Sequence, residues 1–279
     1  MHNPVRIALL TALTMLAFAG NSLLCRVALR DTAIDAASFT SIRLVSGALV
    51  LALIIWSRAG RPLASGSWWG AACLFGYAAF FSFAYRDLTA ATGALLLFGT
   101  VQTSMLGFGL ARGERLRTLQ AAGLAVAVGG LVYMLLPGLA APPLLGAAFM
   151  IAAGVSWAGY SLIGRGVQDA TGATAGNFIL AVPFTVVLSL ATLPSAELDR
   201  VGVAYAVASG AVTSGLGYVL WYAVLPSFQA ATAAIIQLSV PAIAALGGVM
   251  LLAEPLTSRL AIASFAILGG IALTIVRPR

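Results

Sequence analysis

Residues 89–116 read TAATGALLLFGTVQTSMLGFGLARGERL, and residues 229–256 repeat the pattern as QAATAAIIQLSVPAIAALGGVMLLAEPL. A shift of 140 positions aligns identical residues at both ends of the two stretches, including Glu114 with Glu254. A pattern that recurs at a fixed spacing indicates an internal duplication. The architecture of the chain follows from this repeat.

A second match extends the duplication toward the start of the chain. Residues 20–26 align with residues 159–165 at a shift of 139. The difference of one residue between the two shifts is what a loop of variable length produces. We therefore expect two homologous units, residues 5–137 and residues 143–277.

The composition is that of a helical membrane protein. Hydrophobic residues make up 61% of the chain and charged residues 8%. All fifteen basic residues are arginines spread over short loops, so the net charge of +7 suits lipid headgroups and not nucleic acid. The only histidine is His2, and Cys25 and Cys73 stand in apolar runs. We expect no metal site, no cofactor and no disulfide.

Membrane-spanning helices of about 20 apolar residues account for nearly the whole chain. Glycines and prolines separate the apolar runs, as expected for short connecting loops. The sequence predicts ten spans, near residues 6–27, 36–57, 67–85, 89–111, 118–136, 144–165, 174–193, 201–224, 228–252 and 258–276.

Five spans per unit is an odd number, so the second unit must enter the membrane from the opposite face. The two units then form an inverted repeat, the architecture of secondary transporters. Nine loop arginines fall on the side of the amino terminus and five on the other side. The positive-inside rule predicts that both termini are cytoplasmic.

Two short motifs carry a family resemblance. Residues 113–120 with Gly129-Gly130, and residues 253–257 with Gly269-Gly270, resemble the ends of EamA domains. The chain resembles the ten-helix branch of the drug/metabolite transporter superfamily, and most of all the YddG-type amino-acid exporters. The resemblance implies alternating access in the bacterial inner membrane. The family often has a proline in both the fourth and the ninth helix, whereas this chain has Pro241 in the ninth and Val101 in the fourth.

Polar side chains at bilayer depth are costly and therefore informative. On the first predicted span they form a stripe, Thr11, Thr14, Asn21, Ser22 and Cys25 with Phe18. Its counterparts on the sixth span include Trp157, Tyr160 and Ser161. We expect these stripes to face an aqueous cavity; the alternative is hydrogen bonding and packing between helices.

Further candidates lie near the membrane centre. The fourth span contains Gln102, and the ninth contains Gln237, Ser239 and Pro241. Because Pro241 frees a backbone carbonyl upstream, amide and backbone groups could both meet a substrate. The alternative is that the glutamines bond neighbouring helices. The predicted substrate-binding residues are Asn21, Tyr77, Gln102, Trp157, Tyr160, Gln237 and Ser239.

Aromatic residues are divided by their depth along the spans. Tyr77 is central, and with Trp157 it could flank an aromatic substrate or attract an ammonium group. Residues nearer to helix ends are expected in an interfacial belt: Trp68, Trp69, Phe81, Tyr85, Trp221 and Tyr222.

Charged residues near the spans have structural explanations. Arg43 has no acid within the membrane as a partner, so it either anchors backbone carbonyls or meets a bound carboxylate. With Pro241 and Tyr218 it is assigned to gating or structure. Glu114 and Glu254 stand beside Arg115 and Arg259, and we expect them to be loop and capping charges.

These features favour a transporter over an intramembrane enzyme or a channel, since no catalytic set is found at membrane depth. Without an embedded acid or several embedded cations, a small neutral or zwitterionic solute fits best. The absence at that depth of a group that titrates near physiological pH, such as Asp, Glu or His, predicts facilitative movement. The alternative is proton-coupled export of other drugs or metabolites. The expected partners are a small-molecule substrate and membrane lipid, with the protein as a monomer.

Overall fold

The computed structural model describes residues 4–57, 65–113, 116–138, 141–164, 167–228, 233 and 236–275. All secondary structure in this part of the chain is helical. The first half contains α1 (Pro4–Asp31), α2 (Ala36–Ser57), α3 (Trp68–Tyr85), α4 (Ala90–Ala111) and α5 (Thr118–Leu135). The second half contains α6 (Leu144–Ile163), α7 (Ala170–Ala191), α8 (Arg200–Val207), a π-helix (Ala208–Leu216), α9 (Gly217–Val224), α11 (Ser239–Leu252) and α12 (Ser258–Ile275).

Local chemistry at the loop ends explains where several helices begin. The hydroxyl groups of Ser67 and Thr89 accept hydrogen bonds from backbone N–H groups in the first turns of α3 and α4. The carboxylates of Asp169 and Asp199 do the same for α7 and α8. These side chains satisfy N–H groups that have no partner within the helix.

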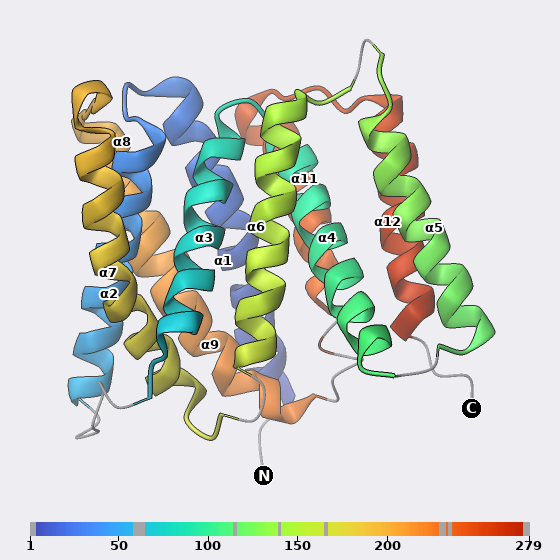
Figure 1. Cartoon of the computed structure of the whole chain (residues 1–279), viewed down its shortest axis with the longest axis horizontal. Helices are drawn as coiled ribbons and strands as arrows, with labels where there is room; N and C mark the ends of the chain where they lie inside the picture. The colour runs from blue at the N-terminus through green and yellow to red at the C-terminus, as the bar shows by residue number, and fades with distance from the viewer. Residues whose placement is uncertain are drawn as a thin grey trace.

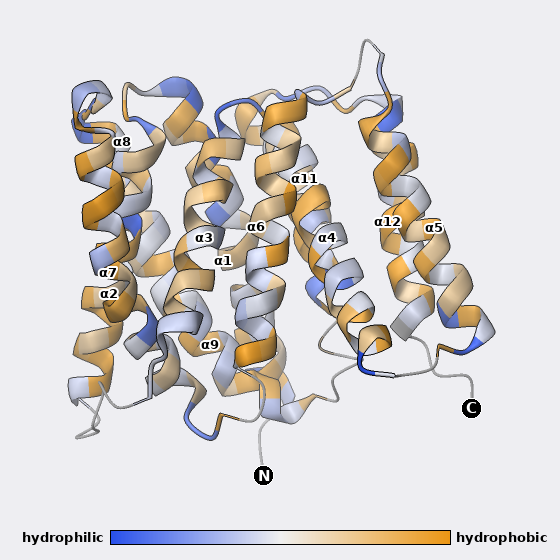
Figure 2. Ribbon diagram, viewed as in Figure 1, coloured by the Kyte–Doolittle hydropathy of each residue, from blue (hydrophilic) through white to orange (hydrophobic). Residues whose placement is uncertain are grey.

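The helices are long and apolar enough for a membrane. Seven helical segments of the described chain meet that description by length and hydropathy, the longest being Pro4–Asp31 and Arg200–Ser227. Large apolar side chains are exposed along these segments, for example Leu49 and Leu190. Figure 2 shows hydrophobic residues along the helices and hydrophilic ones mainly near their ends. Such a surface suits lipid, and this is a multi-pass membrane protein.

The helices form one bundle in which the two halves of the chain interleave (Figure 1). α5 packs against α12, α2 against α7, and α3 and α4 against α6. α1 packs against both α9 and α11. Each helix named here therefore has a neighbour from the other half, and the space enclosed by the bundle is lined by both.

Two expected spans differ from continuous α-helices. The eighth, expected at 201–224, contains the π-helix Ala208–Leu216 between α8 and α9. The ninth, expected at 228–252, contains α11 only from Ser239 onward; residues 229–232, 234 and 235 lie outside the described chain. Residues 233, 236 and 237 are also helical, and a turn at Leu238 separates them from α11. Pro241 lies in the first turn of α11, where backbone N–H groups have no partner within that helix.

Candidate functional site

A cavity of about 690 Å³ lies between the two halves of the chain. Most of its wall comes from α1, α3, α4, α6, α7, α9 and the π-helix, with single residues from α5 and α12. This volume is in the range of small-molecule sites. The wall includes most of the predicted substrate-binding residues: Asn21, Tyr77, Gln102, Trp157, Tyr160 and Gln237.

Ser239 is not on this wall. Its hydroxyl group donates a 2.7 Å hydrogen bond to the carbonyl of Ile236, three residues earlier. The hydroxyl hydrogen is therefore engaged in a local contact at the start of α11. Pro241 is buried in α11 and is not on the wall either. Of the three residues that the sequence grouped on the ninth span, Gln237 lies on the cavity wall, whereas Ser239 and Pro241 do not.

Asn21 stands at the centre of a polar network. Its side-chain oxygen accepts hydrogen bonds from the hydroxyl groups of Ser209 and Thr213, at 2.7 and 3.3 Å. Its nitrogen donates to the phenolic oxygen of Tyr77 at 3.3 Å. The π-helix contributes both hydroxyl groups, and such irregular turns are frequent at functional sites. The network fixes the orientation of the Asn21 amide.

Arg43 lies behind the cavity wall and is 1% exposed. Its Nη2 donates to the phenolic oxygen of Tyr77 and its Nε to the hydroxyl of Ser214, both at 3.3 Å. Its guanidinium lies over the rings of Tyr77 and Phe81, at 5.2 and 5.0 Å from their centroids. Within the described chain, its Nη1 has no hydrogen-bond partner. All of these contacts are neutral groups.

Aromatic side chains cover one side of the cavity. The ring of Trp157 is 4.7 Å from that of Tyr77, 5.3 Å from Tyr160 and 5.4 Å from Tyr218. Phe18 packs edge-on against Tyr218 at 5.8 Å. These rings come from four different elements, so only the packed bundle assembles them. They can contact an apolar or aromatic group and attract a cation over their faces.

Gln102 and Gln237 also face the cavity. Neither amide side chain makes a hydrogen bond to another part of the described chain. The geometry therefore does not show the alternative, in which the two glutamine amides bond neighbouring helices. Their donors and acceptors are available to a solute.

The aromatic belt expected from the sequence is wrong for several residues. Phe81, Tyr85 and Trp221 are buried, and Phe81, Trp221 and Tyr222 lie on the cavity wall. The prediction used depth along each helix, whereas the cavity extends close to helix ends. Trp68 and Trp69, at the start of α3, are exposed.

The stripe predicted on the first span divides into two groups. Phe18, Asn21 and Ser22 lie on the cavity wall, whereas Thr11, Thr14 and Cys25 do not. The hydroxyl groups of Thr11 and Thr14 each donate at 2.8 Å to a carbonyl four residues earlier in α1. Wall residues that the sequence did not single out include Gln120, Thr174, Asn177, Thr213, Ser214 and Thr274.

The cavity reaches toward one face of the bundle. Its wall includes Gly109, Gly164 and Leu225, which lie near the ends of α4, α6 and α9, and Gln120 near the start of α5. This is the face at which α1 begins and α12 ends (Figure 1). The wall residues do not include those at the opposite face, where α1 ends and α4 begins.

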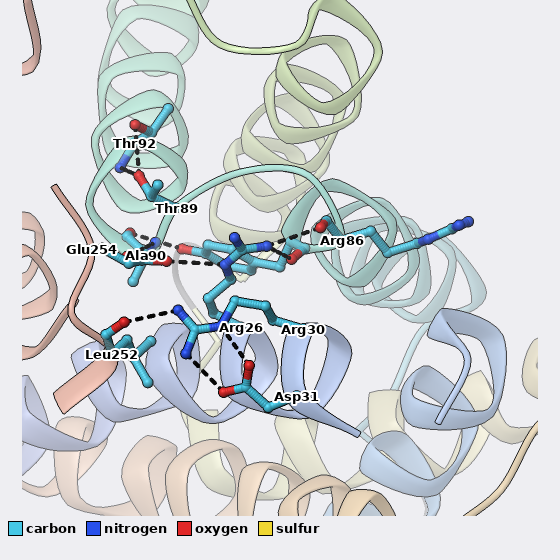
Figure 3. A network of polar contacts seen from close by, with 10 residues as sticks. Arg26, Arg30, Asp31, Arg86, Thr89, Ala90, Thr92, Leu252 and Glu254 are labelled. Carbon is cyan, nitrogen blue, oxygen red and sulfur yellow. Dashed lines mark hydrogen bonds and ion pairs between the residues drawn. The ribbon is translucent and has the colours of Figure 1, made fainter. Parts of the chain in front are cut away.

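At that opposite face, a polar network joins the two halves (Figure 3). Arg26 Nε donates to Glu254 Oε1 at 3.0 Å, and Arg26 Nη1 donates to the carbonyls of Tyr85 and Arg86 at 3.0 and 2.9 Å. Glu254 Oε2 accepts from the backbone N–H of Ala90 at 2.8 Å. The network ties α1, α3, α4 and the residues after α11 together.

The sequence placed Glu254 beside Arg259 and predicted a loop or capping charge. The carboxylate is a capping group, but it caps α4 in the other half of the chain and pairs with Arg26. Arg259 instead donates to the carbonyl of Leu136 and lies 5.8 Å from the ring of Tyr133. Packing of α1 against α11 brings Arg26 within hydrogen-bonding distance of Glu254, although Arg259 is only five positions away in sequence. Glu114 and Arg115 lie outside the described chain.

Comparison with known proteins places this architecture in a family. Residues 144–276 match the EamA-like transporter family. A Pseudomonas aeruginosa protein, "Uncharacterized protein PA1977", is 56% identical over 276 residues, covering 98% of this chain and 96% of the relative. The chain belongs to the EamA-like transporter family.

Two further comparisons agree with membership of the EamA-like family. An Archaeoglobus fulgidus "Uncharacterized transporter" is 27% identical over 283 residues, covering 95% of this chain and 96% of the relative. A solved structure, "Crystal structure of protein", covers 98% of both chains at 20% identity with a TM-score of 0.66, which shows a shared fold. This EamA-like protein is a membrane transporter of small molecules, surrounded by lipid.

Proposed function

We propose that this protein exports small neutral or zwitterionic metabolites, chiefly aromatic and other neutral amino acids, from the cytoplasm. The convergence of Asn21, Tyr77, Gln102, Trp157 and Gln237 on one cavity carries the proposal. The aromatic rings suit an apolar side chain, and the free amides suit the charged ends of an amino acid. The cavity wall, as far as the chain is described, contains no Asp or Glu that would select a cation.

The proposed architecture has ten membrane spans in two inverted units, residues 5–137 and 143–277. This relation makes α1 equivalent to α6, α2 to α7, α3 to the α8 to α9 segment, α4 to α11 and α5 to α12. A two-fold relation then requires the α3–α6 contact to have a counterpart in α1–α9, and α4–α6 in α1–α11. Both counterparts occur, and α2–α7, α4–α11 and α5–α12 are in contact as self-equivalent pairs. This pattern supports the inverted repeat.

The proposed mechanism is alternating access in the bacterial inner membrane, with both termini in the cytoplasm. The cavity reaches toward the face at which α1 begins, and the Arg26–Glu254 network joins the helices at the other face. Rocking of the two units would exchange these roles. In this proposal the substrate enters from the cytoplasm and leaves after the network opens. In this proposal movement is facilitative and follows the solute gradient, because the described part of the cavity wall contains no acid or histidine to carry a proton.

Transport of a panel of labelled amino acids by reconstituted proteoliposomes tests the proposal. Counterflow of neutral aromatic and aliphatic amino acids is expected, and saturation by unlabelled substrate separates a carrier from a leak. Trp157→Ala should lower the rate, while Trp69→Ala, which removes an exposed ring, serves as the matched control. Failure of every amino acid to move, with other metabolites moving, would overturn the amino-acid assignment. Conductance without saturation would indicate a channel.

A further inference from the structure

The buried charge of Arg43 lacks a counter-ion in the described structure. The two ion pairs of that part of the chain join Arg26 to Glu254 and Arg30 to Asp31, and neither involves Arg43. Its contacts are the phenol of Tyr77, the hydroxyl of Ser214 and two ring faces. A buried cation compensated only by neutral groups is energetically costly, so an anion bound nearby would be favoured.

Tyr77 joins this charge to the cavity. Its phenolic oxygen accepts two hydrogen bonds, from Arg43 Nη2 and from Asn21 Nδ2, both at 3.3 Å. Because a phenol carries one hydrogen of its own, the Tyr77 O–H remains free to donate elsewhere. Tyr77 lies on the cavity wall, so that hydrogen is available to a solute acceptor.

Asn21 supplies a second donor. Its oxygen is occupied by the hydroxyl groups of Ser209 and Thr213, which sets the amide orientation. One hydrogen of its NH₂ group is donated to Tyr77, and the other remains. Asn21 also lies on the cavity wall. Two neutral donors therefore stand side by side with a buried positive charge behind them.

We propose that Tyr77 and Asn21, backed by Arg43, form a carboxylate subsite that binds the acid group of the transported solute. This inference rests on the proposed function and deepens it. Hydrogen bonds to a carboxylate are charge-assisted and stronger than those to a neutral group. Arg43 is the positioning residue, since it orients Tyr77 and supplies the field without lying on the wall. The aromatic rings around Trp157 then receive the rest of the solute.

Three probes of matched size test the subsite by direct binding to the purified full chain in nanodiscs. L-phenylalanine has both charged groups, 3-phenylpropanoate has only the carboxylate, and L-phenylalaninamide has only the ammonium. L-phenylalanine and 3-phenylpropanoate are expected to bind, and L-phenylalaninamide is expected to bind at least about tenfold more weakly. That difference is the size expected for a hydrogen bond to a charged group.

Variants separate binding from folding. Tyr77→Phe keeps the ring contact with Trp157 and removes the donor, so affinity for both carboxylates should fall about ten- to hundredfold while that of the amide stays unchanged. Arg43→Lys keeps the charge and changes its hydrogen bonds, and should weaken only carboxylate binding. Tyr205→Phe, whose half-buried hydroxyl lies off the cavity wall, is the matched control.

The outcomes distinguish this inference from the proposed function. Equal binding of phenylalaninamide and phenylalanine, together with phenylalanine transport, would overturn the subsite and leave amino-acid export standing. Binding of 3-phenylpropanoate without transport of any amino acid of the labelled panel would keep the subsite and overturn the amino-acid export proposal. Failure of all three probes to bind would overturn the subsite.

Discussion

Arg26 Nε and Glu254 Oε1 lie 3.0 Å apart although 228 residues separate them along the chain. Both side chains are largely buried, and the second carboxylate oxygen accepts from the first N–H of α4. One ion pair thus connects three helical segments at the face that the cavity wall does not reach. The proposed alternating access requires these contacts to break when this face opens.

Replacing Glu254 by Gln should favour opening at this face. Loss of a charge-assisted contact is worth about 1.5 kcal/mol or more, which corresponds to about tenfold in population. In a Cys73→Ala background, Cys25 reports the change, because it is buried beside Arg26. Its modification by a membrane-impermeant maleimide is expected to become about tenfold faster.

Glu197→Gln is the control for the loss of one negative charge, since Glu197 is an exposed acid in the loop before α8. Arg26→Gln is the reciprocal change, and its matched control is Arg86→Gln, because the Arg86 side chain is exposed. If Cys25 reacts no faster in Glu254→Gln than in Glu197→Gln, the ion pair does not hold this face closed.

Trp157→Ala is expected to reduce transport of aromatic solutes by about 2- to 30-fold. The removed ring contacts Tyr77, Tyr160 and Tyr218, and cation–π contacts are worth about 0.5 to 2 kcal/mol. Initial rates in proteoliposomes, normalised to monodisperse protein, measure the effect. Trp157→Phe should retain part of the rate. Transport at the parental level by Trp157→Ala would remove this ring from the substrate site.

A pH gradient alone should not drive solute uphill. Glu254 is engaged with Arg26 and Ala90 and lies away from the cavity wall, and no histidine or acid belongs to the described part of that wall. Proteoliposomes holding equal solute on both sides, given a pH step, measure this directly. Accumulation that disappears in Glu254→Gln or Glu114→Gln would show proton coupling instead.

Gly210→Ala should destabilise the protein by about 1–3 kcal/mol, the usual range for an overpacked site. A Cβ at this position of the π-helix would collide with the Arg43 carbonyl and the Ser46 hydroxyl of α2. Thermal unfolding in detergent measures the loss. Gly107→Ala is the control, because its Cβ would meet nothing within 4 Å and alanine favours the helix. Equal melting temperatures for the two variants would contradict the close approach.

Much of the helical framework follows from local chemistry. Without water in the bilayer, each apolar segment must satisfy its own backbone hydrogen bonds, so long apolar runs become helices. Ser67, Thr89 and Asp169 cap helices that begin near the expected residues, because a cap needs only neighbours three positions away. The π-helix was not predictable, since it has no periodic signature in an apolar run, whereas Pro241 marks the interruption of the ninth span just before α11.

The sequence also indicated several cavity residues, because polar groups such as Asn21 and Gln102 are costly in lipid. It could not place Trp221 or Phe81, since an aromatic side chain is equally compatible with lipid, core and cavity. Nor could it show that Arg43 lies behind Tyr77, which depends on how α2 meets α3.

Helix formation and burial of polar groups are therefore determined by the sequence itself, because they depend on backbone satisfaction and on the cost of polarity in lipid. The partner of Glu254, in contrast, is decided by tertiary structure. Glu254 has Arg259 five positions away, yet it pairs with Arg26 across the bundle. The spacing of residues along the sequence determines which side chains can contact each other within one helix. The packing of different helices determines which residues far apart in sequence come into contact.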